Sequence, residues 1–209
     1  MDTELAVSAD TGVVTITDRE GDIYEMLAMT RSDNSDLPYR AKHNRRVDNE
    51  LKYLFPSLSA SQPMGEMEIV LPKTEKRKGR KAIVTIRYTQ VRIMAPQNLV
   101  GKTGQESISV NAISVVEENP PQGEKGIEWR LLTTLAIKNY DDVLTYIRWY
   151  TYGWLIERYH YVLKSGCGVD SLQLETAERV KKALATYAIV AWRLLWLLYE
   201  SRNNPDREQ

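Results

Sequence analysis

The stretch GVVTITDREGDIYEMLAMTRSDNSDLPYRAKH, residues 12–43, decides the fold class. Residues 12–17 are rich in β-branched side chains and predict a strand that ends at Asp18. The next residues place apolar side chains at helical spacing, and residues 37–43 predict a second short strand. A strand–helix–strand unit is typical of α/β proteins and favours a parallel pair of strands.

Residues 59–134 have a different pattern, which predicts a small antiparallel β module inserted into the α/β unit. Turn-rich stretches separate its four β-branched runs, MEIVLP, AIVTIRYTQVRIM, SISVNAISVVE and IEWRLLTT. The loop at residues 73–81, KTEKRKGRK, is strongly basic. Such a run is either a solvated hairpin or a phosphate contact, and the sequence leaves both open.

The remaining residues predict two helices. The first runs from about Asp141 to Lys164 and ends where SGCG supplies glycines. The second covers about 176–201, and one side of it is expected to face the core. That side carries Val180, Leu184, Tyr187, Val190, Ala191, Leu194 and Leu198. The expected segments are therefore 1–58, 59–134, 135–201 and a tail, 202–209.

Composition excludes little. Lys plus Arg equals Asp plus Glu at 28 each, so any nucleic-acid function must rest on local clusters. The single Cys167 cannot form an internal disulfide, which predicts a reducing cytoplasm, and no signal peptide is visible. The apolar segment 183–199 is slightly short for a membrane span and contains Arg193. It predicts a buried amphipathic helix rather than a membrane partner.

The first helix contains YTYGWLIERYHYVLKSGCG, residues 150–168. Spacings of 4, 3, 4 and 3 place five of its residues on one side, named here the aromatic stripe. The stripe consists of Tyr150, Trp154, Glu157, Tyr161 and Lys164. One interpretation is a half-buried helix with Glu157 in a salt bridge. The other is that Glu157 holds a metal while Lys164 and the rings grip a nucleotide ligand.

A metal site for phosphoryl chemistry needs a second carboxylate beside Glu157. Asp18 is the best candidate, because α/β active sites lie at the carboxyl ends of strands. Asp22 is another candidate, although we expect it on the surface of the following helix. The pair Glu157 and His160 lacks the further ligands of a di-iron site, and Cys167 lacks a placed base.

Several of these blocks occur together, and in the same order, in a known family. TDREGDIYEML, YRAKHNRR, the β-rich insertion, EENPPQGEKGIEWRLLTT and the aromatic stripe resemble a DDE transposase of bacterial insertion sequences. In the branch that the chain resembles, an RNase H-like core carries an all-β insertion before its last catalytic glutamate. The branch signature is Tyr, two residues, Arg, three residues, Glu, six residues, Lys. Tyr150, Glu157 and Lys164 match that spacing.

The resemblance implies an α/β fold with a partial RNase H-like core, and metal-dependent DNA cleavage and strand transfer at transposon ends. It implies that Asp18 and Glu157 are catalytic and hold Mg²⁺ or Mn²⁺. The implied DNA-binding residues are Arg40, Trp129, Tyr150, Trp154 and Lys164, with Trp129 helping to hold a flipped base. The implied location is the bacterial cytoplasm, at the nucleoid.

The sequence departs from the family in two respects. Gly153 occupies the position of the signature arginine, and no upstream strand supplies the first catalytic aspartate. The chain therefore resembles the back half of a transposase, with an open sheet edge. We expect weak metal binding, and either a homodimer or dependence on an intact transposase. The alternatives are a non-catalytic DNA-binding or regulatory module that interferes with intact copies, and an interaction protein without a nucleic-acid role.

Overall fold

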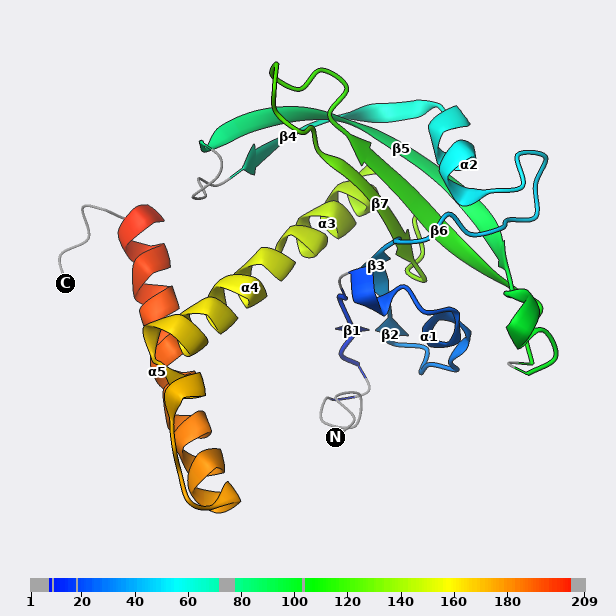
Figure 1. Ribbon diagram of the computed structural model, residues 1–209. Helices are drawn as coiled ribbons and strands as arrows, with labels where there is room; N and C mark the ends of the chain where they lie inside the picture. Colours follow the sequence, from blue (N-terminus) through cyan, green and yellow to red (C-terminus); the bar gives the residue numbers. More distant parts are fainter. Residues whose placement is uncertain (1–7, 9, 18, 72–77, 103, 204–209) are drawn as a thin grey trace. The chain divides into compact units, whose positions relative to one another are not determined.

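The chain forms two compact units, Met1–Tyr150 and Thr151–Gln209. Figure 1 shows the computed structural model. The residues that it describes are 8, 10–17, 19–71, 78–102 and 104–203. Asp18 and most of the basic loop 73–81 therefore lie outside the described residues.

The first unit is built on a five-stranded antiparallel sheet of order β3-β7-β6-β5-β4 (Figure 1). The strands are β3 (Pro38–Arg40), β4 (Pro63–Leu71), β5 (Arg80–Met94), β6 (Ser107–Val116) and β7 (Glu128–Thr133). Strands β4 to β7 match the four β-branched runs, so the antiparallel module predicted from their alternation is confirmed. A 3-10 turn, η3 (Gln97–Leu99), follows β5.

A parallel pair lies beside this sheet. β1 (Val13–Val14) pairs in parallel with β2 (Ser35–Asp36), and Thr17 continues the alignment by bridging to Tyr39 of β3. The predicted parallel pair is confirmed in part. Residues 12–17 do pair in parallel, but β2 precedes the predicted strand at 37–43, which contributes only the Thr17–Tyr39 bridge and otherwise pairs antiparallel with β7. The connection between its strands contains a 3-10 turn, η2 (Arg19–Gly21), and one short helix, α1 (Tyr24–Ala28).

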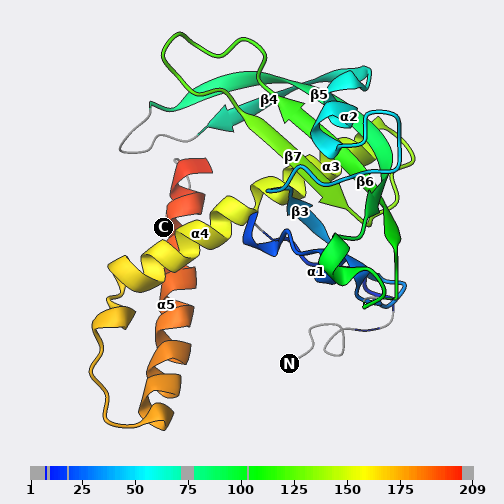
Figure 2. The same cartoon turned by 45° about the vertical axis from the view of Figure 1, so that its right-hand side comes forward.

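Helices α1 and α2 (Leu54–Ala60) pack against one face of the sheet (Figure 2). The sequence pattern did not predict α2, which is only 7 residues long. Leu54 and Leu58 stand four residues apart, so both point to the core and both are fully buried. Pro56 falls in the first turn, where the missing N–H costs no hydrogen bond.

Helix α3 (Tyr140–Thr151) crosses the opposite face of the sheet (Figure 1). One row of paired residues runs across four strands there: Gly65, Ile86, Val115 and Trp129. Tyr140 lies against Gly65 at one end of this row, and Tyr150 lies against Trp129 at the other. Ten residues of helix rise about 15 Å. Three strand spacings cover about the same length, so α3 runs almost perpendicular to the strands.

The second unit begins where the sequence predicted the middle of one helix, and that prediction of a single helix is wrong. Helix α3 ends at Thr151, and α4 (Gly153–Tyr161) begins after Tyr152. A tight bond from Leu155 N–H to the carbonyl of Tyr152 (2.9 Å) starts α4, with Gly153 as its first residue. The elements that follow are a π-helix, η4 (Val162–Gly166), a 3-10 turn, η5 (Val169–Ser171), and α5 (Ala177–Asn203).

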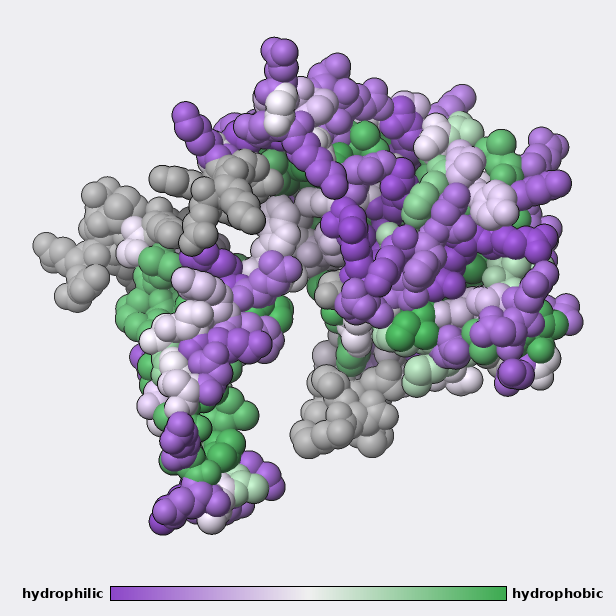
Figure 3. Space-filling model, viewed as in Figure 1, coloured by the Kyte–Doolittle hydropathy of each residue, from purple (hydrophilic) through white to green (hydrophobic). Residues whose placement is uncertain are grey.

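Helix α5 was predicted to bury one side, but of that side only Ala191 is buried. Within its unit α5 contacts α4 and η4, which are too short to cover a helix of 27 residues. Figure 3 shows apolar side chains exposed along it. By length and composition alone, Ala177–Ser201 could cross a membrane, a test that the core helix of a soluble protein also passes.

Candidate nucleic-acid interface

The rings of Trp129 and Tyr150 form the centre of the candidate site. Their centroids lie 5.3 Å apart with planes at 63°, which is an edge-to-face pair. Trp129 is only 6% exposed, while Tyr150 is half-buried. The buried indole of Trp129 therefore packs against the ring of Tyr150, and Tyr150 is the member of the pair that solvent can reach.

Arg40 lies on the strand next to Trp129. Arg40 is paired with Leu131 of β7, so these two side chains point to the same face of the sheet. Trp129 is two residues from Leu131 along β7 and therefore points to that face as well. One guanidinium nitrogen donates a hydrogen bond to the carbonyl of Glu128 at 2.7 Å. This contact holds the half-buried cation beside Trp129 while a guanidinium retains further donors for an anion.

Three of the predicted DNA-binding residues are thus brought to one end of the sheet. Arg40, Trp129 and Tyr150 come from β3, β7 and α3, which are far apart in the sequence. An arginine and an accessible aromatic ring at one place are suited to bind the end of a DNA strand. The cation can contact a phosphate, and the ring can stack on a base.

The remaining members of the aromatic stripe belong to the second unit. Glu157, Tyr161 and Lys164 are exposed, and Trp154 is half-buried. Within the described residues Glu157 has no ion pair, so the salt bridge considered from the sequence is absent there. The π-helix holds Lys164 through an i to i−5 bond from Cys167 N–H to the carbonyl of Val162 (2.8 Å). The even α-helical spacing of the stripe therefore ends at Tyr161.

The two predicted catalytic carboxylates are not brought together by what the structure describes. Glu157 is placed on α4, whereas Asp18 lies outside the described residues. No group of three His, Cys, Asp or Glu side chains in the described part of the chain is arranged to hold a metal ion.

Asp22 was expected on a helix surface, and that expectation is wrong. Its side chain is fully buried beside Arg45, whose side chain is 10% exposed. Arg45 donates two hydrogen bonds to Oδ1, at 2.6 and 2.8 Å, while the backbone N–H groups of Lys42 and His43 donate to Oδ2. All four bonds serve to shape the loop after β3. Asp22 is consequently a structural anchor and not a metal ligand.

Tyr39 lies close to this anchor. Burial and the charge of Asp22 raise the pKa of Tyr39 above its usual value. Its hydroxyl is buried and lies near the side chains of Asp22 and Arg45. A neutral phenol at this place keeps further charge away from the buried pair of Asp22 and Arg45.

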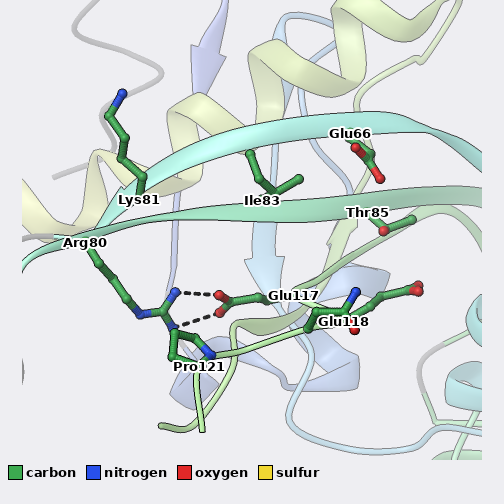
Figure 4. A pocket seen from close by; sticks show the side chains of 9 residues that line it. Glu66, Arg80, Lys81, Ile83, Thr85, Glu117, Glu118 and Pro121 are labelled. Atoms are coloured by element: carbon green, nitrogen blue, oxygen red, sulfur yellow. Dashed lines mark hydrogen bonds and ion pairs between the residues drawn. The ribbon is translucent and has the colours of Figure 1, made fainter.

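A second concentration of charge lies at the start of β5. Arg80 donates hydrogen bonds to both carboxylate oxygens of Glu117 (Figure 4). It also donates one to Glu124 at 2.6 Å. Glu117 is buried and also accepts the N–H of Ile127 at 3.1 Å. A pocket of about 370 Å³ opens beside this cluster. The group fastens the loop before β7 to the sheet.

This cluster bears on whether the basic loop 73–81 is a solvated hairpin or a phosphate contact. Three cations of this loop are described. Lys78 is exposed, whereas Arg80 and Lys81 are both engaged, the latter with Glu68 at 2.9 Å. Residues 73–77 lie outside the described residues, so a phosphate contact there remains a prediction.

The sequence pattern did not predict two residue pairs that hold elements of the first unit in place. Asp22 and Arg45, and Gly65 and Tyr140, are each separated by many residues and carry no periodic signal. A mixed α/β fold with C-terminal helices is what the structure establishes. No family model matches the sequence.

Proposed function

We propose that this chain is part of a DDE-type transposase that grips DNA ends and depends on further residues for catalysis. The observation that carries the proposal is the edge-to-face pair of Trp129 and Tyr150 beside Arg40. These residues were predicted from the family resemblance in separate sequence blocks, and they lie at one end of one sheet. An RNase H-like core is part of this proposal.

In this proposal each residue has a distinct task. Arg40 contacts a backbone phosphate, because a guanidinium matches the geometry of phosphate oxygens. Tyr150 stacks on an unpaired base, and Trp129 positions Tyr150 from below. Trp154 and Lys164, which belong to the second unit, are assigned DNA contacts of their own, with Lys164 as a point charge for phosphate.

Metal-dependent cleavage and strand transfer belong to the same proposal only as a property of a completed site. Asp18, Glu157 and a further acid would hold Mg²⁺ or Mn²⁺, which would activate a hydroxyl and stabilise the leaving oxygen. The second candidate function is a regulatory DNA-binding protein that interferes with intact transposases. The convergence of Arg40, Trp129 and Tyr150 supports this candidate as well, because it concerns DNA contact and not catalysis.

Binding is tested by fluorescence anisotropy with short duplexes that have frayed ends, over a series of salt concentrations. Arg40→Ala and Lys164→Ala are expected to weaken binding and to lower the salt slope, each by about one ion. Tyr150→Ala is expected to weaken binding without changing the salt slope. Lys102→Ala, which removes an exposed cation outside the site, is the control. Equal effects of Lys102→Ala and Arg40→Ala would contradict the proposed interface.

Catalysis is tested with supercoiled plasmid in Mg²⁺ or Mn²⁺. We expect no nicking by this chain alone. Nicking that is lost in both Asp18→Asn and Glu157→Gln would instead establish a complete active site in this chain.

A further inference from the structure

The side chain of Glu117 holds the chain just before β7. Glu117 donates its backbone N–H to the carbonyl of Ile127 at 2.8 Å, and one oxygen of its carboxylate accepts the N–H of Ile127 at 3.1 Å. The same side chain is only 4% exposed and accepts two hydrogen bonds from Arg80 (Figure 4). Two parallel bonds from a guanidinium fix the geometry of a carboxylate. Glu117 is therefore a rigid point of attachment for Ile127.

The two residues that follow Ile127 belong to the candidate interface. The carbonyl of Glu128 accepts the hydrogen bond of Arg40 at 2.7 Å, and Trp129 supports the accessible ring of the edge-to-face pair. β3 pairs only with the later residues of β7, so within the described residues β6 is the one strand that pairs with Glu128 and Trp129. The end of a strand opens more readily than its centre. The attachment of Ile127 opposes such opening.

We propose that Glu117 is a positioning residue of the DNA-end interface, an inference that rests on the proposed function. Glu117 acts through the backbone at Ile127. Holding Ile127 fixes the carbonyl of Glu128, which restrains Arg40, and it fixes the indole of Trp129. When Ile127 is released, the cation and the ring no longer converge, and the chain binds a DNA end more weakly.

Hydrogen exchange of wild type tests the inference without a substitution. If the form in which Ile127 is open binds DNA more weakly, then bound DNA raises the free energy of that opening by the same factor. The Ile127 amide should exchange about tenfold more slowly with a saturating frayed duplex than without it. The amide of Val100, which is bonded in the turn after β5, should keep its rate. An unchanged Ile127 rate with a duplex that binds overturns the proposal.

Two carboxylates that share Arg80 provide a matched pair of variants. Glu117→Gln removes the buried charge and turns an amide group toward hydrogen-bond donors, so it weakens the attachment of Ile127 at nearly constant side-chain volume. Glu124→Gln breaks the other ion pair of Arg80, at 2.6 Å, and leaves the bonds of Ile127 in place. In fluorescence anisotropy with frayed duplexes, Glu117→Gln is expected to bind about tenfold more weakly than wild type. Glu124→Gln is expected to bind nearly as well as wild type.

A double-mutant cycle shows whether the effect passes through Arg40. In the Arg40→Ala background, Glu117→Gln should weaken binding by about threefold rather than tenfold, because only the part that acts through Trp129 remains. Equal losses in both backgrounds overturn the proposal. So does equal binding of Glu117→Gln and wild type, with native circular dichroism. If Glu117→Gln does not fold, the exchange rates of wild type decide. Absence of any binding by wild type overturns the proposed function, and this inference with it.

Discussion

Gly65 leaves the space that the phenol of Tyr140 occupies. A Cβ on Gly65 would lie 2.6 Å from the Tyr140 hydroxyl and 2.7 Å from its Cζ. The same hydroxyl donates to the carbonyl of Glu66 at 3.1 Å, so α3 is held at its first residue. At the other end of α3, Tyr150 rests on Trp129, which means that the orientation of the helix places Tyr150.

Gly65→Ala is therefore expected to displace Tyr140 and to lower the free energy of unfolding by about 1–3 kcal/mol. The melting temperature by circular dichroism measures this. Gly12→Ala is the control, because no atom lies within 4 Å of the Cβ that it adds. Equal melting temperatures for the two variants would show that Gly65 does not hold α3.

Trp129→Ala is expected to cost about 3–5 kcal/mol of stability, because it removes a buried indole. It is also expected to weaken DNA-end binding through loss of the support for Tyr150. Tyr150→Phe keeps the edge-to-face pair and should bind DNA nearly as well as wild type. If Tyr150→Phe binds as weakly as Tyr150→Ala, the hydroxyl and not the ring carries the contact.

Asp22→Asn is expected to reduce the free energy of unfolding by about 3 kcal/mol or more. The change leaves the buried Arg45 cation without its carboxylate and turns an amide toward backbone donors. Glu20→Gln breaks the exposed pair with Lys42 and should cost less than about 1 kcal/mol. Urea unfolding monitored by tryptophan fluorescence compares the two. Equal losses would contradict the role of Asp22 as an anchor.

Tyr39→Phe is expected to change the response to alkaline pH. The folded state raises the pKa of Tyr39, chiefly through burial and then through Asp22, so it binds the phenolic proton more tightly than the unfolded chain. The resulting stability is complete below about pH 10 and is lost as pH rises further. The free energy of unfolding of Tyr39→Phe should therefore fall less steeply above that pH than that of wild type, and the two should differ little at neutral pH. Tyr53→Phe, at an exposed site, is the control.

Gly153→Arg supplies the arginine that the family signature expects. No atom lies within 4 Å of a Cβ added to Gly153, so both Gly153→Ala and Gly153→Arg should fold and stabilise α4 by up to about 1 kcal/mol. Only Gly153→Arg should tighten DNA binding and raise the salt slope by about one ion. Identical affinities for the two variants would show that this end of α4 does not face DNA.

Local sequence patterns were enough to predict most strands of the first unit. Alternating β-branched runs are local signals, and β4 to β7 follow them closely. Residues 12–17 pair in parallel as expected, but with β2 at Ser35–Asp36, before the predicted strand at 37–43. Residues 54–60 were not recognised as α2, because 7 residues are too few to establish a helical period. The sequence also did not predict that the 141–164 helix is divided at Tyr152, because the apolar spacing continues across that residue.

The arrangement of these elements around the candidate site depends on contacts between residues that are distant in the chain. The burial of Asp22 depends on a loop that comes 20 residues later, which no periodicity encodes. The convergence of Arg40, Trp129 and Tyr150 follows from a sheet register and a helix that crosses it at right angles. Sequence patterns report which face of an element is apolar. The relation of one element to another is set by packing between residues distant in the chain, as Gly65 and Tyr140 show.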